Sequence, residues 1–517
     1  MSVAGPSQDA NDSPSGGSER SERGGPVMNF ALNSRERRGL LLLLVAVVAV
    51  RLATLGAYPL LDPTESRYAE IARKMLETGD WLVPQVDYGV PFWGKPPLST
   101  WLSAAAMAVF GVNEFAARLP SLLLMAGCAT MVYRLAALRA GADAALWALA
   151  AFATTGLVFV SAGAVMTDPA LAFATTLSMA GFWIALHGPA SVRRVAGFTF
   201  FIGLAAGLLA KGPVALVLTL LPVGAWTLWT RQWRAAWINL PWLIGTLLTL
   251  GLAVPWYWAA ERASPGFLDY FLLGEHWKRF VESGWKGDLY GQAHARPRGT
   301  IWVWWFAAAL PWSPMAVAWL ARTLAARRDD TRRLFRDPWC AYLLLWAIVP
   351  MLFFTVSGNV LPTYVLPGLP AFALLLCEFW RPRSGDAASP RFAVKLMLAG
   401  GIGLLVVFVG VLATQRQKFD VDQSHRALVR TFETTRGTAS GRLVYVGQRP
   451  ISAEFYTGGK AAKVTDANAL VAYRTSPEMD FFAVRDSDLR TWPEAAREGL
   501  VDLGKFGDYR LLREPER

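Results

Sequence analysis

The sequence predicts a mainly α-helical protein that crosses a membrane many times and ends in a small α/β domain. Of its 517 residues, 54% are hydrophobic and only 17% are charged, whereas a soluble domain carries about a quarter charged residues. The apolar residues gather in blocks, such as 40–50, 247–254 and 396–412, that approach the length needed to span a bilayer of about 30 Å. The 23 Trp and 28 Phe residues fit aromatic belts at the two membrane surfaces.

The first 36 residues are rich in Ser, Gly, Asp and Arg and contain few aliphatic residues. This composition predicts a disordered tail. It contains no apolar stretch ahead of a small-residue cleavage site, so a signal peptide is not indicated. Arg35, Arg37 and Arg38 flank the first apolar block and place the N-terminus in the cytoplasm by the positive-inside rule.

Basic residues recur on alternate connections between the apolar blocks of the transmembrane region, 37–413. This arrangement explains the formal charge of +12 through membrane topology, so we expect no nucleic-acid partner. The basic connections contain Arg134 and Arg139, Arg193 and Arg194, Arg231 and Arg234, Arg322 to Arg336, and Arg381 and Arg383; the intervening ones are 58–101, 162–169, 211–213, 261–300 and 357–363. With the basic set inside, we expect about eleven spans, within a range of 11–13, and an external C-terminus.

The composition changes at about Thr414, where charged residues return. We expect strands at 442–446, 481–484 and 509–512, with helices possible at 453–456 and 492–498. Residues 414–517 are therefore predicted to form a periplasmic α/β domain. The three cysteines, Cys128, Cys340 and Cys377, lie in apolar blocks, so we read them as buried hydrophobic residues and expect no disulfide framework.

The first external loop, 58–101, contains a helical pattern in which apolar residues from Tyr68 to Leu76 share one face, which predicts an amphipathic helix at the interface. Asp62 and Glu65 at its start fit a capping box around Pro63. Charge beside a membrane span is costly and usually functional, so the sequence leaves capping and function about equally favoured for the two carboxylates. Glu70 and Lys74 have the i, i+4 spacing of a surface ion pair.

Other charged residues lie at the ends of external connections. Asp168 precedes Pro169 and could simply be a helix cap. Lys95, Lys211 and Arg279 could be side chains that extend to lipid headgroups, but Lys95 and Lys211 each stand in a Gly-Pro or Pro-Pro context that such a role does not require. Carboxylates and cations gathered on one membrane face suit a phosphorylated, lipid-borne substrate.

These residues together resemble the membrane glycosyltransferases of the GT-C class, and within it the bacterial lipid A aminoarabinose transferase family, which is related to protein O-mannosyltransferases. No single motif is specific, but the segments occur in consistent order between about residues 40 and 380. They are Asp62–Glu70 with Gly79-Asp80-Trp81, Lys95–Leu98 ending in Trp101, Phe115–Leu119, Thr167–Pro169, Lys211-Gly212, Glu275–Phe280 with His294, Leu310–Trp312, and Leu361–Tyr364 with Leu366-Pro367.

The resemblance implies a GT-C fold in the bacterial inner membrane and a sugar donor linked to undecaprenyl phosphate. The implied acceptor on the periplasmic face is lipid A of lipopolysaccharide, or a protein hydroxyl as in O-mannosyltransferases. By position, the resemblance predicts catalytic carboxylates at Asp62, Glu65 and Asp168. It also predicts substrate-binding roles for six residues: Arg67, Tyr68, Lys95, Lys211, Arg279 and Tyr364.

One position departs from the family pattern. Gly94 stands where members closer to the lipid A enzymes tend to have Glu before Lys-Pro-Pro, and His276 is the position at which the family would use a metal ligand. One histidine alone makes a poor metal site, so a divalent metal is possible but a tightly held zinc is not expected. Two other classes stay open from the sequence: a flippase or transporter of lipid-linked sugars, and a lipid-binding assembly protein.

Overall fold

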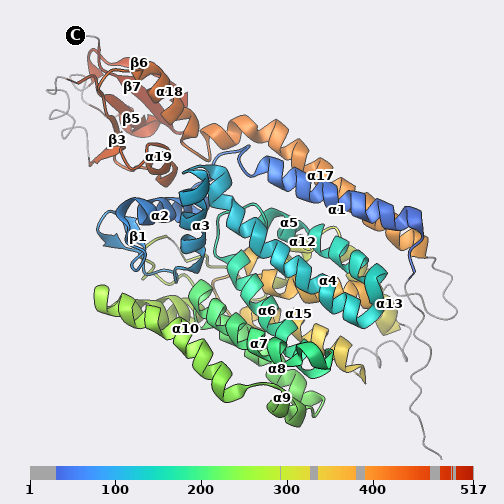
Figure 1. Cartoon of the computed structure of the whole chain (residues 1–517). Helices are drawn as coiled ribbons and strands as arrows, with labels where there is room; N and C mark the ends of the chain where they lie inside the picture. Colours follow the sequence, from blue (N-terminus) through green and yellow to red (C-terminus); the bar gives the residue numbers. More distant parts are fainter. Residues whose placement is uncertain are drawn as a thin grey trace, which may run out of the picture.

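A bundle of apolar helices forms most of the chain and carries a small mixed sheet at one end in this computed structural model (Figure 1). The structure describes residues 31–291, 293–325, 336–379, 390–465, 478–490, 492 and 497–515. Most of the expected cytoplasmic tail, 1–36, therefore lies outside the described residues. The first helix begins at Ser34, where Asn33 and Glu36 form a reciprocal capping box.

The helices follow one another along the chain with short connections. In order, they are α1 (Ser34–Thr54), α2 (Thr64–Thr78), α3 (Leu98–Phe110), α4 (Glu114–Ala153), α5 (Gly156–Ser161), α6 (Asp168–His187), α7 (Ala190–Lys211), α8 (Val214–Trp229), α9 (Trp233–Asn239), α10 (Trp242–Ala263), the π-helix η1 (Asp269–Lys278), α11 (Arg279–Val281), α12 (Thr300–Ala308), α13 (Ser313–Ala325), α15 (Pro338–Thr355), the 3-10 helix η2 (Pro362–Gly368), α16 (Leu369–Phe379), α17 (Pro390–Val421), α18 (Arg426–Arg436), α19 (Ile451–Tyr456) and α21 (Asp486–Leu489).

Seven helices in the described part of the chain are long and apolar enough to cross a membrane, or eight if the bent pair α12 and α13 forms one span. Three further segments would raise this to the expected eleven: α1, α8, and the part of α4 beyond Gly141, where a φ of 84° breaks the helix. α1 fails a simple test of length and hydropathy because charged residues lie near its ends, and α8 fails because it is too short. The mainly helical, polytopic architecture is confirmed, whereas the number of crossings stays a prediction.

Large aromatic side chains fill the centre of the bundle. Trp147, Trp226, Trp312, Trp339 and Trp346 are each almost completely buried. On the outer surface, by contrast, α10 and α17 expose aliphatic side chains along much of their length, as expected of helices that face lipid. The long α17 runs beside α1 (Figure 1).

The C-terminal region forms a five-stranded sheet in the order β4-β3-β5-β7-β6. Its strands are β3 (Leu443–Val446), β4 (Ala462–Val464), β5 (Phe481–Arg485), β6 (Val501–Phe506) and β7 (Tyr509–Arg513). β3 pairs in parallel with β4 and β5, and β5, β7 and β6 pair antiparallel. The three expected strands are confirmed as β3, β5 and β7, and the expected helix at 453–456 as α19. The possible helix at 492–498 lies mostly outside the described residues. The expected boundary at 413/414 falls inside α17, which continues to Val421, and the domain division stays a prediction.

The first external loop, 58–101, contains α2, the short hairpin of β1 (Gln85–Asp87) and β2 (Val90–Pro91), and the start of α3. Helix α2 of this loop, whose external position stays a prediction, packs against α19 of the C-terminal region (Figure 1). Leu60, Ala72 and Met75 from the loop share one buried cluster with Phe455 of α19. The C-terminal domain is thus seated on the first external loop.

Candidate active site

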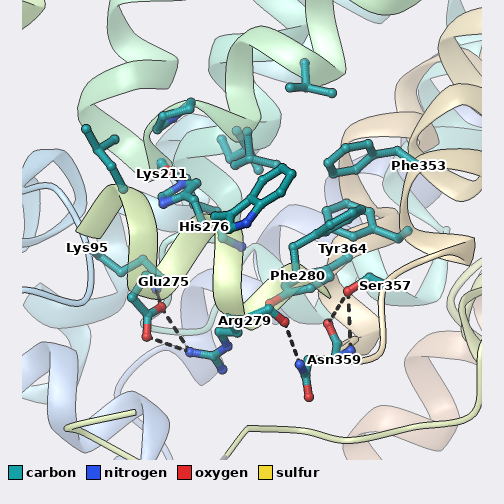
Figure 2. Close-up of a pocket in the computed structure, with 17 residues that line it drawn as sticks. Lys95, Lys211, Glu275, His276, Arg279, Phe280, Phe353, Ser357, Asn359 and Tyr364 are labelled. Carbon is teal, nitrogen blue, oxygen red and sulfur yellow. Dashed lines mark hydrogen bonds and ion pairs between the residues drawn. The ribbon is translucent and has the colours of Figure 1, made fainter. Parts of the chain in front are cut away.

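A cavity of about 360 Å³ opens among α6, α8, η1, α15 and η2, below the first external loop. Most of its lining is apolar, and its polar part contains three cations from separate chain segments (Figure 2). The lining residues are Lys95, Leu171, Lys211, Pro213, Val214, Val217, Leu272, Glu275, His276, Trp277, Arg279, Phe280, Phe353, Phe354, Ser357, Asn359 and Tyr364. An apolar cavity with a few convergent charged groups is the usual form of a small-ligand site.

Glu275 holds two of these cations together. Its carboxylate lies 2.8 Å from Lys95 Nζ and 3.0 Å from Arg279 Nη1, and Figure 2 shows it between them. Its side chain is only 3% exposed, whereas Lys95 and Arg279 are 19% and 16% exposed. The carboxylate therefore lies behind the two cations, and the cations present the accessible charge. Asp288 adds a second carboxylate 3.3 Å from Arg279.

The charges in this group reinforce one another. Burial alone would raise the pKa of Glu275, but Lys95 and Arg279 outweigh it and hold that pKa below its ordinary value. Burial alone would lower the pKa of Lys95, but the attraction and hydrogen bond of Glu275, together with the effect of Tyr68, outweigh burial and raise that pKa. Lys95 and Glu275 are therefore both charged at neutral pH.

Lys211 ends α7 and forms a buried ion pair with Asp168, the first residue of α6. Its ammonium also lies 4.8 Å from the centre of the Tyr364 ring, which favours a cation over the ring face. The helix-capping interpretation of Asp168 is wrong: the cap position is Thr167, with no side-chain cap bond, and the Asp168 carboxylate is used by Lys211.

The π-helix η1 places Glu275 and the residues around it. Such helices are rare and often mark functional sites. His276 links η1 to α7, because one ring nitrogen lies 2.8 Å from the Phe271 carbonyl oxygen and the other 3.0 Å from that of Lys211. Gly212 allows this approach: its φ is +80°, and a Cβ there would lie 2.6 Å from the Phe271 ring. This contact explains why Gly must follow Lys211.

The expected capping box at the start of α2 is not formed. Pro63 is the cap residue, with no side-chain cap bond. The Asp62 carboxylate instead accepts hydrogen bonds from Ser66 and from Ser452 of the C-terminal domain. Burial raises the pKa of Asp62, against the opposing effect of these donors. Glu65 forms a buried ion pair with Arg118, with an oxygen–nitrogen distance of 2.8 Å.

Neither Asp62 nor Glu65 lines the cavity. Arg67 and Tyr68, one turn further along α2, also lie outside its lining. Tyr68 contacts Phe92 edge to face, with ring centres 6.0 Å apart, and contributes to the raised pKa of Lys95. Of the residues predicted from the sequence, the structure thus brings together Lys95, Lys211, Arg279, Tyr364 and His276, with Asp168 directly behind Lys211.

Comparison with known proteins assigns the family. A family model described as dolichyl-phosphate-mannose-protein mannosyltransferase matches residues 38–271. An undecaprenyl phosphate-alpha-4-amino-4-deoxy-L-arabinose arabinosyl transferase 2 from Pseudomonas fluorescens is 30% identical over 423 residues, which cover 79% of this chain and 71% of that protein. The chain belongs to this arabinosyltransferase family. The corresponding transferase of Pseudomonas savastanoi pv. phaseolicola is 32% identical, over 74% of this chain and 68% of its own.

The fold agrees with that family. The crystal structure of ArnT from Cupriavidus metallidurans bound to undecaprenyl phosphate superposes with a TM-score of 0.75 at 19% identity, over 92% of this chain and 97% of that chain. The GT-C fold and the glycosyltransferase class expected from the sequence are therefore confirmed, as is a multi-pass membrane protein. Membership in a transferase family also decides against the flippase and assembly-protein alternatives. The chain spans 64% of the length of the arabinosyltransferase of Pseudomonas paraeruginosa.

A metal ligand role for His276 gains no support from the geometry. Both of its ring nitrogens face backbone carbonyls, and Gly94 supplies no carboxylate beside Lys95. No group of three His, Cys, Asp or Glu side chains within the described ranges is arranged to hold a metal ion. The residues of this family member thus do not fit a resident metal at that position.

Sequence reasoning missed two members of the site. Glu275 stands in a segment that carried the family resemblance, but its i, i+4 spacing to Arg279 was the only local signal of its role. The second is Asn359, which also lines the cavity. Its side-chain amide donates to the carbonyl oxygens of Arg279 and Glu282 at 2.5 and 2.6 Å and so fixes the turn that carries Arg279. No sequence pattern near residue 359 indicates that its side chain contacts Arg279, 80 residues earlier in the chain.

Proposed function

We propose that this protein transfers a sugar from undecaprenyl phosphate to an acceptor on the periplasmic face of the bacterial inner membrane, with lipid A as the acceptor. One observation carries the proposal: Lys95, Lys211 and Arg279 come from three separate segments and line one largely apolar cavity. A polyprenyl phosphate is built to match, because it combines an anionic head group with an apolar chain. The names of the relatives, which are transferases that use undecaprenyl phosphate, support the same donor.

The cations would act mainly on the leaving group. As the bond between the sugar carbon and the phosphate oxygen breaks, negative charge grows on the lipid phosphate. Lys95 and Arg279, held in place by Glu275, would stabilise that charge in the transition state. Arg279 suits paired hydrogen bonds to phosphate oxygens, and Lys95 suits a point-charge contact. Tyr364 stands beside Lys211 in the lining and can donate a hydrogen bond from its hydroxyl.

The acceptor oxygen would form the new bond to the sugar carbon. A hydroxyl acceptor loses a proton in this step and needs a base. A lipid A phosphate is already ionised near neutral pH, because its second pKa is about 6, and needs none. Since the carboxylates within the lining and directly behind it, Glu275 and Asp168, are both paired with cations, the site favours an acceptor that arrives ionised.

The orientation in the membrane follows the same proposal. The N-terminus would lie in the cytoplasm and the C-terminal domain in the periplasm, as the alternating basic connections predict. This arrangement puts the first external loop and the cavity mouth on the side where lipid A and the sugar-linked carrier meet.

The test compares Lys95→Ala with Lys463→Ala in membranes that express equal amounts of protein. Lys463 is exposed on β4 and far along the chain, so it is a matched control. We expect Lys95→Ala to lose at least about a hundredfold in transfer, the cost of removing one transition-state charge contact, and Lys463→Ala to behave as wild type. Mass spectrometry of lipid A and of periplasmic glycoproteins identifies the acceptor. Normal sugar transfer by Lys95→Ala would remove the basis of the proposal.

A further inference from the structure

Asp62, which the family resemblance predicts to be catalytic, links the start of the first external loop to the C-terminal domain. Asp62 accepts three hydrogen bonds: one from Ser66, and two from Ser452, through its hydroxyl and through its backbone N–H at 3.0 Å. A carboxylate has about four good acceptor positions. Three of the four are therefore already occupied by protein donors, which leaves little for a substrate.

Ser452 is the second residue of α19, whose own cap residue, Pro450, makes no side-chain cap bond. The first N–H groups of a helix need acceptors from outside it. Asp62 supplies one from a position 390 residues away in the chain. Asp62 is thus a helix cap, as local pattern allowed, but it caps a helix of the C-terminal domain and not α2.

The rest of this short segment is attached in the same way. The Asp62 N–H donates to the Gln423 carbonyl at 2.9 Å, and the Leu60 N–H donates to the Tyr456 hydroxyl at 2.8 Å. The Ser452 side chain is itself oriented, because its hydroxyl oxygen accepts a hydrogen bond of 2.9 Å from the backbone N–H of His425.

A buried ion pair continues the contact along α2. The Lys74 ammonium lies 2.7 Å from the Glu454 carboxylate, and their side chains are 0% and 5% exposed. Removing one partner of a pair so deeply buried is strongly unfavourable. The two domains are therefore joined by directional contacts at both ends of the α2 surface.

The attachment matters for the cavity because α2 also carries Tyr68. That side chain packs against Phe92, which lies three residues before Lys95 and whose ring lies against Gly94. A shift at the start of α2 would therefore displace Lys95 and, through Glu275, also Arg279.

We propose that Ser452 and Asp62 are positioning residues, and that together they hold the first external loop on the C-terminal domain so that Lys95 keeps its place in the cavity. The inference rests on the proposed function, since its readout is sugar transfer. It assigns the C-terminal domain a part in catalysis that involves no contact with the reacting atoms.

The test is a double-mutant cycle of Ser452→Ala and Asp62→Asn, with Ser452→Thr as a conservative variant. Thr434→Ala is the control, because Thr434 is an exposed hydroxyl of the same domain that bonds only to carbonyls of its own helix. We expect each single variant to lower kcat about tenfold, the typical effect of losing a hydrogen bond to a charged group. The double variant should be no slower than the worse single one, Ser452→Thr should recover most of the activity, and Thr434→Ala should be normal.

The readouts separate this role from others. Trypsin should cut the first external loop faster in Ser452→Ala than in the Thr434→Ala control, since a residue acting only at the reacting atoms would not change that rate. Loss of a thousandfold or more in Asp62→Asn with normal Ser452→Ala would mean that Asp62 acts on substrate and would overturn the inference. So would effects of the two variants that simply multiply. If Lys95→Ala loses transfer while both variants are normal, only this inference fails; if Lys95→Ala is active, the proposed function fails.

Discussion

Replacing Glu275 with Gln should tighten the binding of undecaprenyl phosphate. The carboxylate lies 2.8 Å from Lys95 and 3.0 Å from Arg279. A phosphate oxygen bound on the open side of either cation would be about 6 Å from it, since each contact adds about 2.8 Å. One pair of like charges at about 6 Å repels by about 3 kcal/mol at an effective dielectric constant of about 20. The variant also loses the partner that orients the two cations, which offsets about half of this gain.

The net expectation is about 1.5 kcal/mol, or about tenfold tighter binding, together with slower turnover because the lipid phosphate product leaves more slowly. Calorimetry with a short-chain polyprenyl phosphate measures the first effect and steady-state transfer measures the second. Since Lys95 and Arg279 keep the pKa of Glu275 low against the effect of burial, and the second pKa of a phosphate monoester is about 6, the difference from wild type should be constant from about pH 7 to 8. Glu282→Gln, an exposed neighbour, should change nothing. Weaker binding by Glu275→Gln would refute the reasoning. The main effect of Glu275 on binding would then be to orient Lys95 and Arg279, not to repel the phosphate.

Three further outcomes are expected. Lys74→Met should destabilise the protein by about 2 kcal/mol, because it removes a cation from the buried carboxylates of Glu454 and Glu70, which keep Arg449 and Arg73 as partners; adding Glu454→Leu should recover part of the loss in thermal unfolding. Gly212→Ala should lower both stability and transfer, because its φ is +80° and a Cβ there meets an aromatic ring, whereas Gly224→Ala on α8, with open space around it, should be neutral. The ion pairs of Glu275 should stabilise the fold above its ordinary pKa of 4.5 and be lost as pH falls through its depressed value; the melting temperature of Glu275→Gln should therefore depend less on acidification.

The sequence predicted the membrane bundle well because lipid imposes a simple rule. Apolar blocks separated by alternating basic connections can be recognised without any knowledge of tertiary contacts. The sequence also singles out Lys95 and Lys211, because they stand beside Gly and Pro, a setting that a side chain merely extending to lipid headgroups does not need. Both line the cavity, and their part in substrate binding stays a prediction. The strands β3, β5 and β7 followed from short β-branched and aromatic runs.

The carboxylates were harder to interpret because their partners are remote. Asp62 and Glu65 fit a local capping box, and local pattern could not reveal that Ser452 and Arg118 would take them. The same reason explains the position of Lys74: its predicted i, i+4 ion pair with Glu70 does form, at 3.4 Å, but the predicted surface position is wrong. Lys74 is instead completely buried, because α19 covers α2. A helix face whose sequence predicts solvent exposure can be buried when a domain from elsewhere in the chain packs against it.

The π-helix also sets a constraint on chain length. Each residue in an α-helix turns the chain by about 100°, so deleting one residue between Asp269 and Lys278 would let η1 relax to ordinary helical geometry and swing everything after it around the axis. If the deleted residue precedes Glu275, Glu275 and Arg279 would turn together, away from Lys95 on its separate chain segment. In this family member, therefore, the number of residues in that stretch is as strict a requirement as their identity, and a single-residue deletion there would be as harmful as removing the arginine.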